Sequence, residues 1–292
     1  MEMLQDEVFC LLSNNFELPM NILNRAEEIR IRLGQPVLIR YGNNEFLTKD
    51  IANEKNILML LENFTENSIY AVQSEINSGY LTIKGGHRVG ISGTCIFENG
   101  KIKNIRYISS LNIRVAHEIK GCSNSVMREL YFDNKFENTL ILSSPGSGKT
   151  TLLRDMIRQL SINGNNISVI DERSEIAAMY KGVSQNDLGP RTDVMNNCRK
   201  DTGIRMMIRS MAPNIIATDE IGDNRDIEAI YDAYFAGIKL LLTAHGDSID
   251  DVPTKLLKNK LFKNIVILKK ENLPGVIKNI YRLKEDKYAS CY

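Results

Sequence analysis

The second half of the sequence alternates short, strongly apolar runs with longer amphipathic stretches. The apolar runs have the length of buried strands, and they fall at Thr139–Ser143, Asn166–Asp171, Asn214–Thr218 and Ile238–Thr243. The amphipathic stretches have helical periodicity, and they fall at Lys149–Leu160, Asp201–Met211, Asp223–Phe235 and Asp250–Leu257. Strands that alternate with helices form parallel sheets with covered faces, because each crossover helix packs on the sheet. We therefore expect an α/β fold here.

The first third of the sequence has a different pattern, in which most strands follow one another directly. Glu27–Leu33 alternates apolar and charged residues, which is typical of a half-buried strand. Asn99-Gly100 lies between two apolar runs and predicts a tight hairpin, because both turn residues must adopt positive φ. Further strands are expected at Val37–Tyr41, Leu81–Lys84, Arg88–Phe97, Lys101–Tyr107 and Leu111–Ala116, and helices at Asn53–Asn63, Ser68–Ser78 and Gly121–Phe132.

The polar stretch Asp133–Asn138 separates these two patterns and is the predicted domain boundary. The expected N-terminal domain, a smaller α+β unit, covers residues 1–133, and the α/β domain covers residues 134–292. A last antiparallel hairpin is expected from Asn264–Leu268 and Val276–Leu283, which flank Leu273-Pro274-Gly275.

Composition limits where such a chain works and what it binds. The formal net charge is +1 over 292 residues, so no overall field favours nucleic acid, which is not an expected partner. The first ten residues carry three carboxylates where a signal peptide carries lysine or arginine. No apolar run reaches the roughly 18 residues of a membrane span. The five cysteines form no C-x-x-C pair and suit reduced thiols. We expect a cytoplasmic protein without an integral membrane segment.

The segment from Ser143 to Thr150 connects the predicted strand Thr139–Ser143 to the predicted helix Lys149–Leu160. A glycine-rich turn at a helix N-terminus offers convergent N–H groups and a favourable dipole to a phosphate. Lys149 would reach the β- and γ-phosphates, and the Thr150 hydroxyl would bind Mg²⁺. An ordinary strand–turn–helix is the alternative, but the flanking strand and helix favour phosphate binding. The expected nucleotide-binding residues are Ser144, Pro145, Gly146, Ser147, Gly148, Lys149, Thr150 and Thr151.

Two carboxylates, Asp219 and Glu220, follow the third apolar run. A strand beside the strand of the phosphate loop would deliver Asp219 to the Mg²⁺ shell and Glu220 to the γ-phosphate side. Glu220 could there orient and deprotonate the attacking water. The alternative is an acidic cap on the following helix. The phosphate loop upstream favours the catalytic interpretation, with ATP and Mg²⁺ as cofactors.

Two other strand ends carry candidate catalytic residues. Asp171–Glu175 lies at the sheet edge where α/β proteins bind ligands, and Glu172 is the candidate to approach water or Mg²⁺. A helix cap with a solvated charge run remains the alternative there. His245 ends the fourth run, where a histidine can sense the γ-phosphate through a hydrogen bond. His87 and His117 have no such placement and are expected to be structural.

Phosphoryl transfer also needs positive charge against the γ-phosphate, which an arginine of a neighbouring subunit often supplies. Each arginine of this chain could equally be a solvated surface charge, and the sequence alone does not rank them. The candidates are Arg88, Arg114, Arg191, Arg199, Arg205 and Arg209.

Several stretches together resemble the stage III sporulation protein AA family, which is related to the type II and type IV secretion ATPases. The resemblance runs nearly end to end, through Glu28–Pro36, Gly86–Gly93, Ser110–Arg114, Gly148–Asp155, Asp171–Ala177 and the strand that ends in Asp219-Glu220. It implies a RecA-like P-loop ATPase core behind a smaller N-terminal domain. It also implies a homo-oligomeric ring, with a hexamer as the expected form.

The resemblance also assigns roles to single residues. It places Asp171–Glu175 at the acidic box of secretion ATPases and His245 at their histidine box. Arg209 lies just before the acidic strand, where those relatives carry an arginine, and becomes a catalytic candidate. Ser143 replaces the usual first glycine of the motif, which bears on nucleotide affinity. The implied partners are membrane proteins of the channel between mother cell and forespore. These proteins would hold the ATPase at the membrane, on its mother-cell cytoplasmic side.

Three functions are compatible with the sequence. The first is a ring ATPase that powers or assembles a secretion-like channel during endospore formation. The second is a nucleic-acid-binding P-loop motor or loader, with the loop Lys84–Arg88 at the phosphates, which the near-neutral charge disfavours. The third is a scaffold that binds nucleotide with little hydrolysis. Glu220 disfavours this last function, because binding alone needs no water-directing carboxylate.

Overall fold

The contacts within the chain divide it into two compact units. The computed structural model describes residues 7–68, 72–132, 135–252, 254–271, 275–284 and 287–290. Unit 1 comprises Met1–His117 with Ala178–Gln185, and unit 2 comprises Glu118–Ala177 with Asn186–Tyr292. The contacts therefore change after His117, earlier than the predicted boundary after residue 133, which itself lies outside the described residues. Where the chain divides into independently folding domains stays a prediction.

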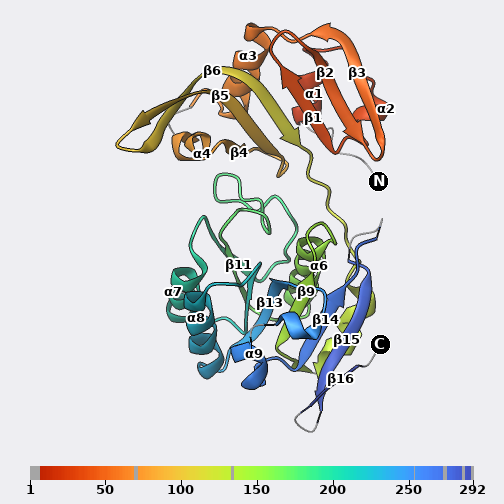
Figure 1. Cartoon of the computed structure of the whole chain (residues 1–292), viewed down its shortest axis with the longest axis vertical. Coiled ribbons are helices and arrows are strands. Elements are labelled where there is room, and N and C mark those ends of the chain that lie inside the picture. Colours follow the sequence, from red (N-terminus) through yellow and green to blue (C-terminus); the bar gives the residue numbers. More distant parts are fainter. Residues whose placement is uncertain are drawn as a thin grey trace. The chain divides into compact units, whose positions relative to one another are not determined.

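Within the described residues, unit 1 is built on a six-stranded antiparallel sheet with the order β3-β2-β1-β6-β5-β4 (Figure 1). Its strands are β1 (Glu28–Arg32), β2 (Pro36–Tyr41), β3 (Asn44–Ile51), β4 (Tyr80–Thr82), β5 (Arg88–Glu98) and β6 (Lys101–Arg114). Its helices are α1 (Glu7–Ser13), α2 (Met20–Leu23), α3 (Glu54–Phe64) and α4 (Gln73–Asn77). One buried core joins Ile31 of β1 and Ile113 of β6 to Leu60 of α3.

Local sequence signals explain much of unit 1. Ile29 and Ile31 of β1 are fully buried between partly exposed charged neighbours, so the predicted alternation is confirmed. Asn99 and Gly100, between β5 and β6, have φ values of 50° and 75°, which confirms the predicted tight turn. The sequence predicts two strands after this turn, but β6 is continuous. Tyr107, with a φ of 47°, marks the irregular point within it.

Other expectations for residues 1–132 are wrong in detail. The sequence predicts a helix over Ser68–Ser78, but the described α-helix there is only α4, and residues 69–71 lie outside the description. The expected helix Gly121–Phe132 is divided into α5 (Asn124–Met127), a 3₁₀ turn (Arg128–Leu130) and β7 (Tyr131–Phe132). Gly121 has a φ of 82°, which belongs to a turn. β3 gives no clear sequence signal, because most of its side chains are exposed.

Unit 2 contains, in its described part, an eight-stranded sheet with the order β11-β10-β12-β13-β9-β14-β15-β16. Its strands are β9 (Thr139–Ser143), β10 (Ile167–Asp171), β11 (Thr192–Asn196), β12 (Ile215–Thr218), β13 (Lys239–His245), β14 (Asn264–Leu268), β15 (Ile277–Lys284) and β16 (Lys287–Ser290). The pairs from β11 to β14 are parallel, and β14, β15 and β16 pair antiparallel. The predicted parallel sheet and terminal hairpin are therefore confirmed; residues 272–274 of its loop lie outside the description.

Helices of unit 2 pack on its sheet (Figure 1). They are α6 (Lys149–Ile162), α7 (Lys200–Ser210), α8 (Asn224–Phe235) and α9 (Thr254–Lys258). Leu140 and Leu142 of β9 share a core with Ile204 of α7 and Ile230 of α8, whereas α6 contacts β9, β10, β11 and β13. A 3₁₀ turn, Ile249–Asp251, replaces the start of the helix expected over Asp250–Leu257. A separate two-stranded sheet pairs β7 with β8 (Lys135–Phe136).

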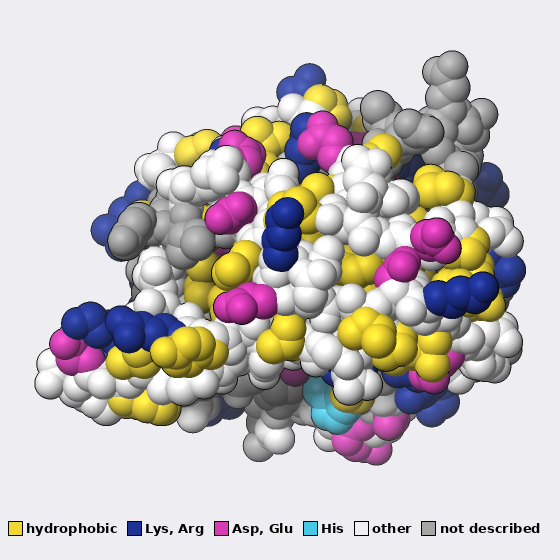
Figure 2. Space-filling model, turned by 90° about the horizontal axis from the view of Figure 1, so that it is seen from above, with side chains coloured by type: hydrophobic (Ala, Val, Ile, Leu, Met, Phe, Trp, Pro, Cys, Tyr) yellow, Lys and Arg dark blue, Asp and Glu magenta, His cyan; other side chains and the backbone are white. Residues whose placement is uncertain are grey.

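Several features of the described residues bear on the expectations from composition. No helix in these ranges is long and apolar enough to cross a membrane. Cys10, Cys95, Cys122 and Cys198 are free, and Cys291 lies outside the description. On the face shown in Figure 2, basic and acidic side chains are interspersed among apolar and neutral ones.

Candidate nucleotide site

The phosphate loop connects β9 to α6 and is shaped by two glycines. Gly146 and Gly148 have φ values of 78° and 84°, in the left-handed region that favours glycine. Gly148 is the N-cap of α6, and no side chain caps the helix there. The first N–H groups of an α-helix have no partner within the helix, so this end can receive an anion. Thr150 and Thr151 lie in the same first turn.

Three serines of the loop have different surroundings. Ser143 is fully buried at the end of β9, opposite His245 of β13, and its φ is not positive. The Ser144 hydroxyl donates a hydrogen bond of 2.6 Å to Asp247. Ser147 is buried, and its Oγ has no hydrogen-bond partner among the described residues. The usual motif has glycine at position 143, but the backbone there has no positive φ in this chain. Serine therefore fits at this position.

Lys149, the first residue of α6, is half-buried beneath this loop. Its Nζ lies 3.3 Å from the carbonyl oxygen of Ala244 in β13. Burial lowers the pKa of Lys149, and the charges of Glu220 and Asp219 oppose that shift. The lysine and the two carboxylates therefore meet at one edge of the sheet. The expectation that their strands are neighbours is wrong, because β13 lies between β9 and β12.

Asp219, directly after β12, is a buried carboxylate with an open acceptor. It is 4% exposed, and its Oδ1 has no hydrogen-bond partner among the described residues. Burial raises the pKa of Asp219 to about 6, against the nearby charge of Lys200. A buried carboxylate oxygen with free lone pairs fits a hard divalent cation such as Mg²⁺. Asp219 is thus suited to the predicted metal, while the described residues form no group of three or more His, Cys, Asp or Glu side chains that could hold one.

Glu220 follows Asp219 directly but is far more exposed to solvent. Its side chain is half-exposed and forms an ion pair of 3.1 Å with Arg173. Its backbone has a φ of 43°, and its N–H donates to Thr243 Oγ1 at 2.8 Å. A positive φ at a glutamate is uncommon. The Glu220 carboxylate lies in the lining of a cavity.

The cavity that Glu220 lines has a volume of about 560 Å³ and a strongly charged lining. It brings together three of the predicted catalytic residues, Glu172, Glu220 and His245. The other lining residues are Arg173, Arg199, Lys200, Asp201, Ile221, Gly222, Asp223, Arg225 and Asp226. The sequence did not single out Arg173, Lys200 or Arg225 as site residues. Arg173 stands within the acidic segment Asp171–Glu175, and Lys200 and Arg225 stand in no recognised motif.

Asp171 and Glu172, in the acidic segment after β10, have different surroundings. Asp171 accepts hydrogen bonds from the backbone N–H groups of Glu175, Ile176 and Ala177, so its carboxylate organises the loop. Burial raises the pKa of Asp171, and these three bonds oppose the shift. Glu172 is partly exposed to the cavity and pairs with Lys200 at 2.6 Å. The Asp171 carboxylate thus organises its own loop, whereas Glu172 lines the cavity, and its catalytic role stays a prediction.

Arg209 does not reach this cavity within its own chain. It lies in the last turn of α7, and its Nε donates to the carbonyl of Arg205. Among the other arginine candidates, Arg199 lines the cavity and Arg205 pairs with Asp232 at 2.8 Å. In unit 1, His87 accepts a hydrogen bond from an N–H of the backbone, and His117 bonds a backbone carbonyl, as expected for structural histidines.

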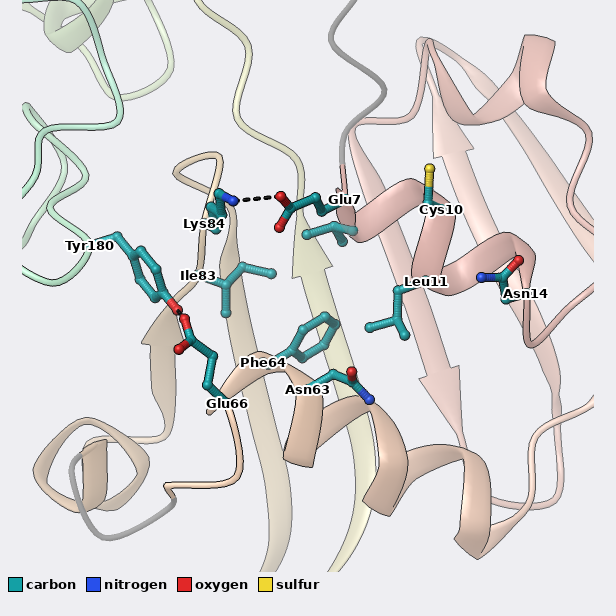
Figure 3. A pocket seen from close by; sticks show the side chains of 11 residues that line it. Glu7, Cys10, Leu11, Asn14, Asn63, Phe64, Glu66, Ile83, Lys84 and Tyr180 are labelled. Carbon is teal, nitrogen blue, oxygen red and sulfur yellow. Dashed lines mark hydrogen bonds and ion pairs between the residues drawn. The ribbon is translucent and has the colours of Figure 1, made fainter.

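A second cavity, of about 350 Å³, lies within unit 1 (Figure 3). Glu7 of α1 forms an ion pair of 2.5 Å with Lys84 across it. Glu66 accepts a hydrogen bond from the Tyr180 hydroxyl and pairs with Lys181. Each charged residue of its lining therefore has a partner, and none of the predicted site residues is among the described residues that line it.

Solved structures with a similar fold include an ATPase and a pilus retraction motor. The X-ray structure of the Legionella pneumophila ATPase DotB has a TM-score of 0.58 at 16% identity, over 91% of this chain and 77% of that chain. The pilus retraction motor PilT, with bound ADP, has a TM-score of 0.56 at 16% identity, over 85% and 76%. At these identities the likeness shows the fold, which is the predicted RecA-like P-loop α/β fold.

Sequence comparisons extend over nearly the whole chain. Stage III sporulation protein AA of Bacillus subtilis (strain 168) is 38% identical over 276 residues, which is 91% of this chain and 89% of that protein. The uncharacterized protein ycf45 of Porphyra purpurea is 28% identical over 186 residues, 62% of this chain and 31% of that protein. A family model described as sporulation stage III, protein AA matches residues 5–288. The chain therefore belongs to the stage III sporulation protein AA family.

Proposed function

We propose that this chain is a Mg²⁺-dependent ATPase that serves a secretion-like channel across the envelope during endospore formation. The observation that carries the proposal is the meeting of three features at one sheet edge: the glycine turn before α6, half-buried Lys149 and buried Asp219 with its open oxygen. Together they offer N–H donors, a cation and a metal ligand to a triphosphate. The fold of secretion ATPases and membership of a sporulation family support the same function.

The residues of the loop would bind and orient the nucleotide. Backbone N–H groups of the first turn of α6 would hold the phosphates, since they have no partner within the helix. Lys149, which donates to the Ala244 carbonyl, would turn to the β- and γ-phosphates. Thr150 and Asp219 would hold Mg²⁺, which supplies positive charge against the phosphate oxygens.

Glu220 would accept the proton of the attacking water. Its carboxylate lines the charged cavity, and its ion pair with Arg173 joins two exposed side chains. Exposed ion pairs contribute little stability, so this pair can open at small cost when water and nucleotide arrive. Glu172 and His245 line the same cavity and would orient the water and sense the γ-phosphate.

Phosphate release and binding of a fluorescent ATP analogue test this function. We expect Lys149→Ala to lose hydrolysis and to bind the analogue more weakly. We expect Glu220→Gln to keep binding but to lose at least about 100-fold in hydrolysis, the contribution of a general base. The control is Lys239→Ala, at the opposite end of β13, where the lysine pairs with Glu137. Unchanged hydrolysis in Lys149→Ala would refute the proposal, and tight binding without hydrolysis in the wild type would support a scaffold instead.

The proposal extends to assembly and to location. A homo-oligomeric ring, with a hexamer as the expected form, would bring an arginine from one subunit to the site of the next. The placement of Arg209 at the far end of α7 from Lys200 supports a role between subunits. Membrane proteins of the sporulation channel would be the partners that hold this cytoplasmic ATPase at the membrane on the mother-cell side.

A further inference from the structure

A second ammonium group, that of Lys200, is buried at the same sheet edge as Lys149. Lys200 is the first residue of α7, and only 6% of its side chain is exposed. Its Nζ lies 2.6 Å from Glu172 Oε2 and 3.9 Å from Asp219 Oδ1. A lysine is disfavoured both by burial and by the positive end of a helix dipole. The two carboxylates therefore compensate a charge that the helix itself does not favour.

Asp219 lies near several other negative charges, which Lys200 partly balances. The carboxylates of Asp171, Glu175 and Glu220 all add negative potential at Asp219, and Lys200 opposes them. Asp219 Oδ1 lies within ion-pair distance of Lys200 but has no hydrogen-bond partner among the described residues. Its lone pairs therefore stay available for a cation, although a positive charge already stands nearby.

We propose that Lys200 is a built-in counterion that keeps free Mg²⁺ out of this acidic edge, so that the metal enters only together with the nucleotide. The inference rests on the proposed ATPase function, because it concerns the same site. An ammonium near Asp219 repels a divalent cation at that oxygen. It also engages Glu172 in an ion pair, which must open before Glu172 can turn to a metal or to water.

The nucleotide changes this balance of charge. A triphosphate brings several negative charges to the α6 N-terminus, and these attract Mg²⁺ more strongly than the carboxylates do alone. With the phosphates present, the repulsion from Lys200 no longer prevents binding. Lys200 acts through Asp219 and Glu172, and it is therefore a positioning residue and not a catalytic one.

Thermal unfolding without nucleotide, in the presence and absence of MgCl₂, tests this inference. Wild-type protein is expected to show a Tm shift below about 1 °C, because Lys200 opposes binding of the free metal. Lys200→Met is expected to gain about 3 °C or more with MgCl₂, since a cation that binds only the folded state stabilises it. The double variant Lys200→Met/Asp219→Asn is expected to lose this gain, because the ligand oxygen is no longer charged.

Two lysine variants serve as matched controls. Lys200→Arg keeps the positive charge and is expected to respond to MgCl₂ as the wild type does. Lys239→Met removes a partly exposed lysine whose Nζ pairs with Glu137 at 2.7 Å, at the other end of β13. The Tm of Lys239→Met is expected not to change with MgCl₂, because this substitution frees no carboxylate of the nucleotide site.

The outcomes separate this inference from the ATPase proposal. A folded Lys200→Met variant whose Tm does not respond to MgCl₂ overturns the role of Lys200, as does a wild type that responds equally. If Lys200→Met gives no cooperative transition, Lys200→Gln replaces it, and binding of Mn²⁺ measured by electron paramagnetic resonance decides in the same way. Binding of the fluorescent ATP analogue to the wild type is measured in parallel, and its absence contradicts the ATPase proposal instead.

Discussion

Three buried aspartates of unit 2 differ in what their neighbours offer them. Asp171 accepts three backbone N–H groups of its own loop. Asp155 accepts hydrogen bonds from the N–H and hydroxyl of Ser123 and from Arg158. Asp219 Oδ1 has no such partner among the described residues. The first two carboxylates therefore stabilise local structure, whereas the third remains open to a ligand at some cost to stability.

The hydrogen bonds of Asp155 predict a loss of stability that depends on pH. Burial alone would raise its pKa, but the bonds from Ser123, Gly121 and Arg158 outweigh burial and hold it below the ordinary value of 3.8. A lowered pKa contributes stability above the unfolded value, and the contribution is lost as pH falls toward the folded value. We expect Asp155→Asn to cost about 2 kcal/mol of unfolding free energy at pH 7 and less at pH 3.

Urea unfolding at both pH values measures this difference. The control is Asp232→Asn, because Asp232 forms an exposed ion pair with Arg205, and such pairs contribute less than about 1 kcal/mol. An equal cost of Asp155→Asn at pH 3 and pH 7 would contradict the assigned origin of its stabilisation.

At the scale of the element, the turn between β9 and α6 depends on backbone geometry at single positions. Gly148 has a φ of 84°, where a residue with a Cβ is strained. Ser143 ends β9 without a positive φ, and its hydroxyl donates to the Ser144 carbonyl. The turn therefore needs glycine at position 148 but not at position 143, where the usual motif has one.

A pair of substitutions tests this distinction. We expect Gly148→Ala to weaken binding of the fluorescent ATP analogue by about tenfold or more, because the left-handed backbone would relax and move the N–H groups. We expect Ser143→Gly to change the affinity by less than about threefold, since the backbone there already suits serine. Circular dichroism checks that both variants fold. A neutral Gly148→Ala or a large effect of Ser143→Gly would contradict the argument.

At the scale of the whole molecule, α7 separates two positive groups that belong to the proposed reaction. Lys200 begins the helix at the cavity, and Arg209 lies in its last turn. The 11 residues of α7 span roughly 16 Å at 1.5 Å per residue. Within one subunit, Arg209 is not among the described residues that line the cavity of Glu220. We expect Arg209 to act at the site of a second copy of the chain.

Mixing two inactive variants tests that expectation. We expect Arg209→Ala to bind ATP but to lose about 1,000-fold in hydrolysis, the contribution of an arginine finger. A mixture of Arg209→Ala and Lys149→Ala subunits should regain part of the activity, because some interfaces then combine an intact lysine with an intact arginine. Lys239→Ala, whose lysine pairs with Glu137 at the other end of β13, is the control and should stay active. Two inactive variants that do not complement each other would argue against a shared site.

The sequence by itself determined features that depend on neighbouring residues. The apolar runs identified β9, β10, β12 and β13, because buried strands need continuous apolar side chains on both faces. The Asn99-Gly100 turn and the glycine before α6 followed from the backbone conformations that each site requires. Where strands are mostly exposed, as in β3, the pattern was too weak to predict them.

Only the tertiary structure decided which distant segments lie together. The sequence placed the acidic strand beside the phosphate-loop strand, but β13 lies between them. It gave no indication that Lys200 pairs with Glu172 and lies near Asp219, since no motif contains all three. Strand order and charge pairing depend on how helices and strands pack over long sequence separations. Local propensity and periodicity, which the sequence records directly, do not encode those choices.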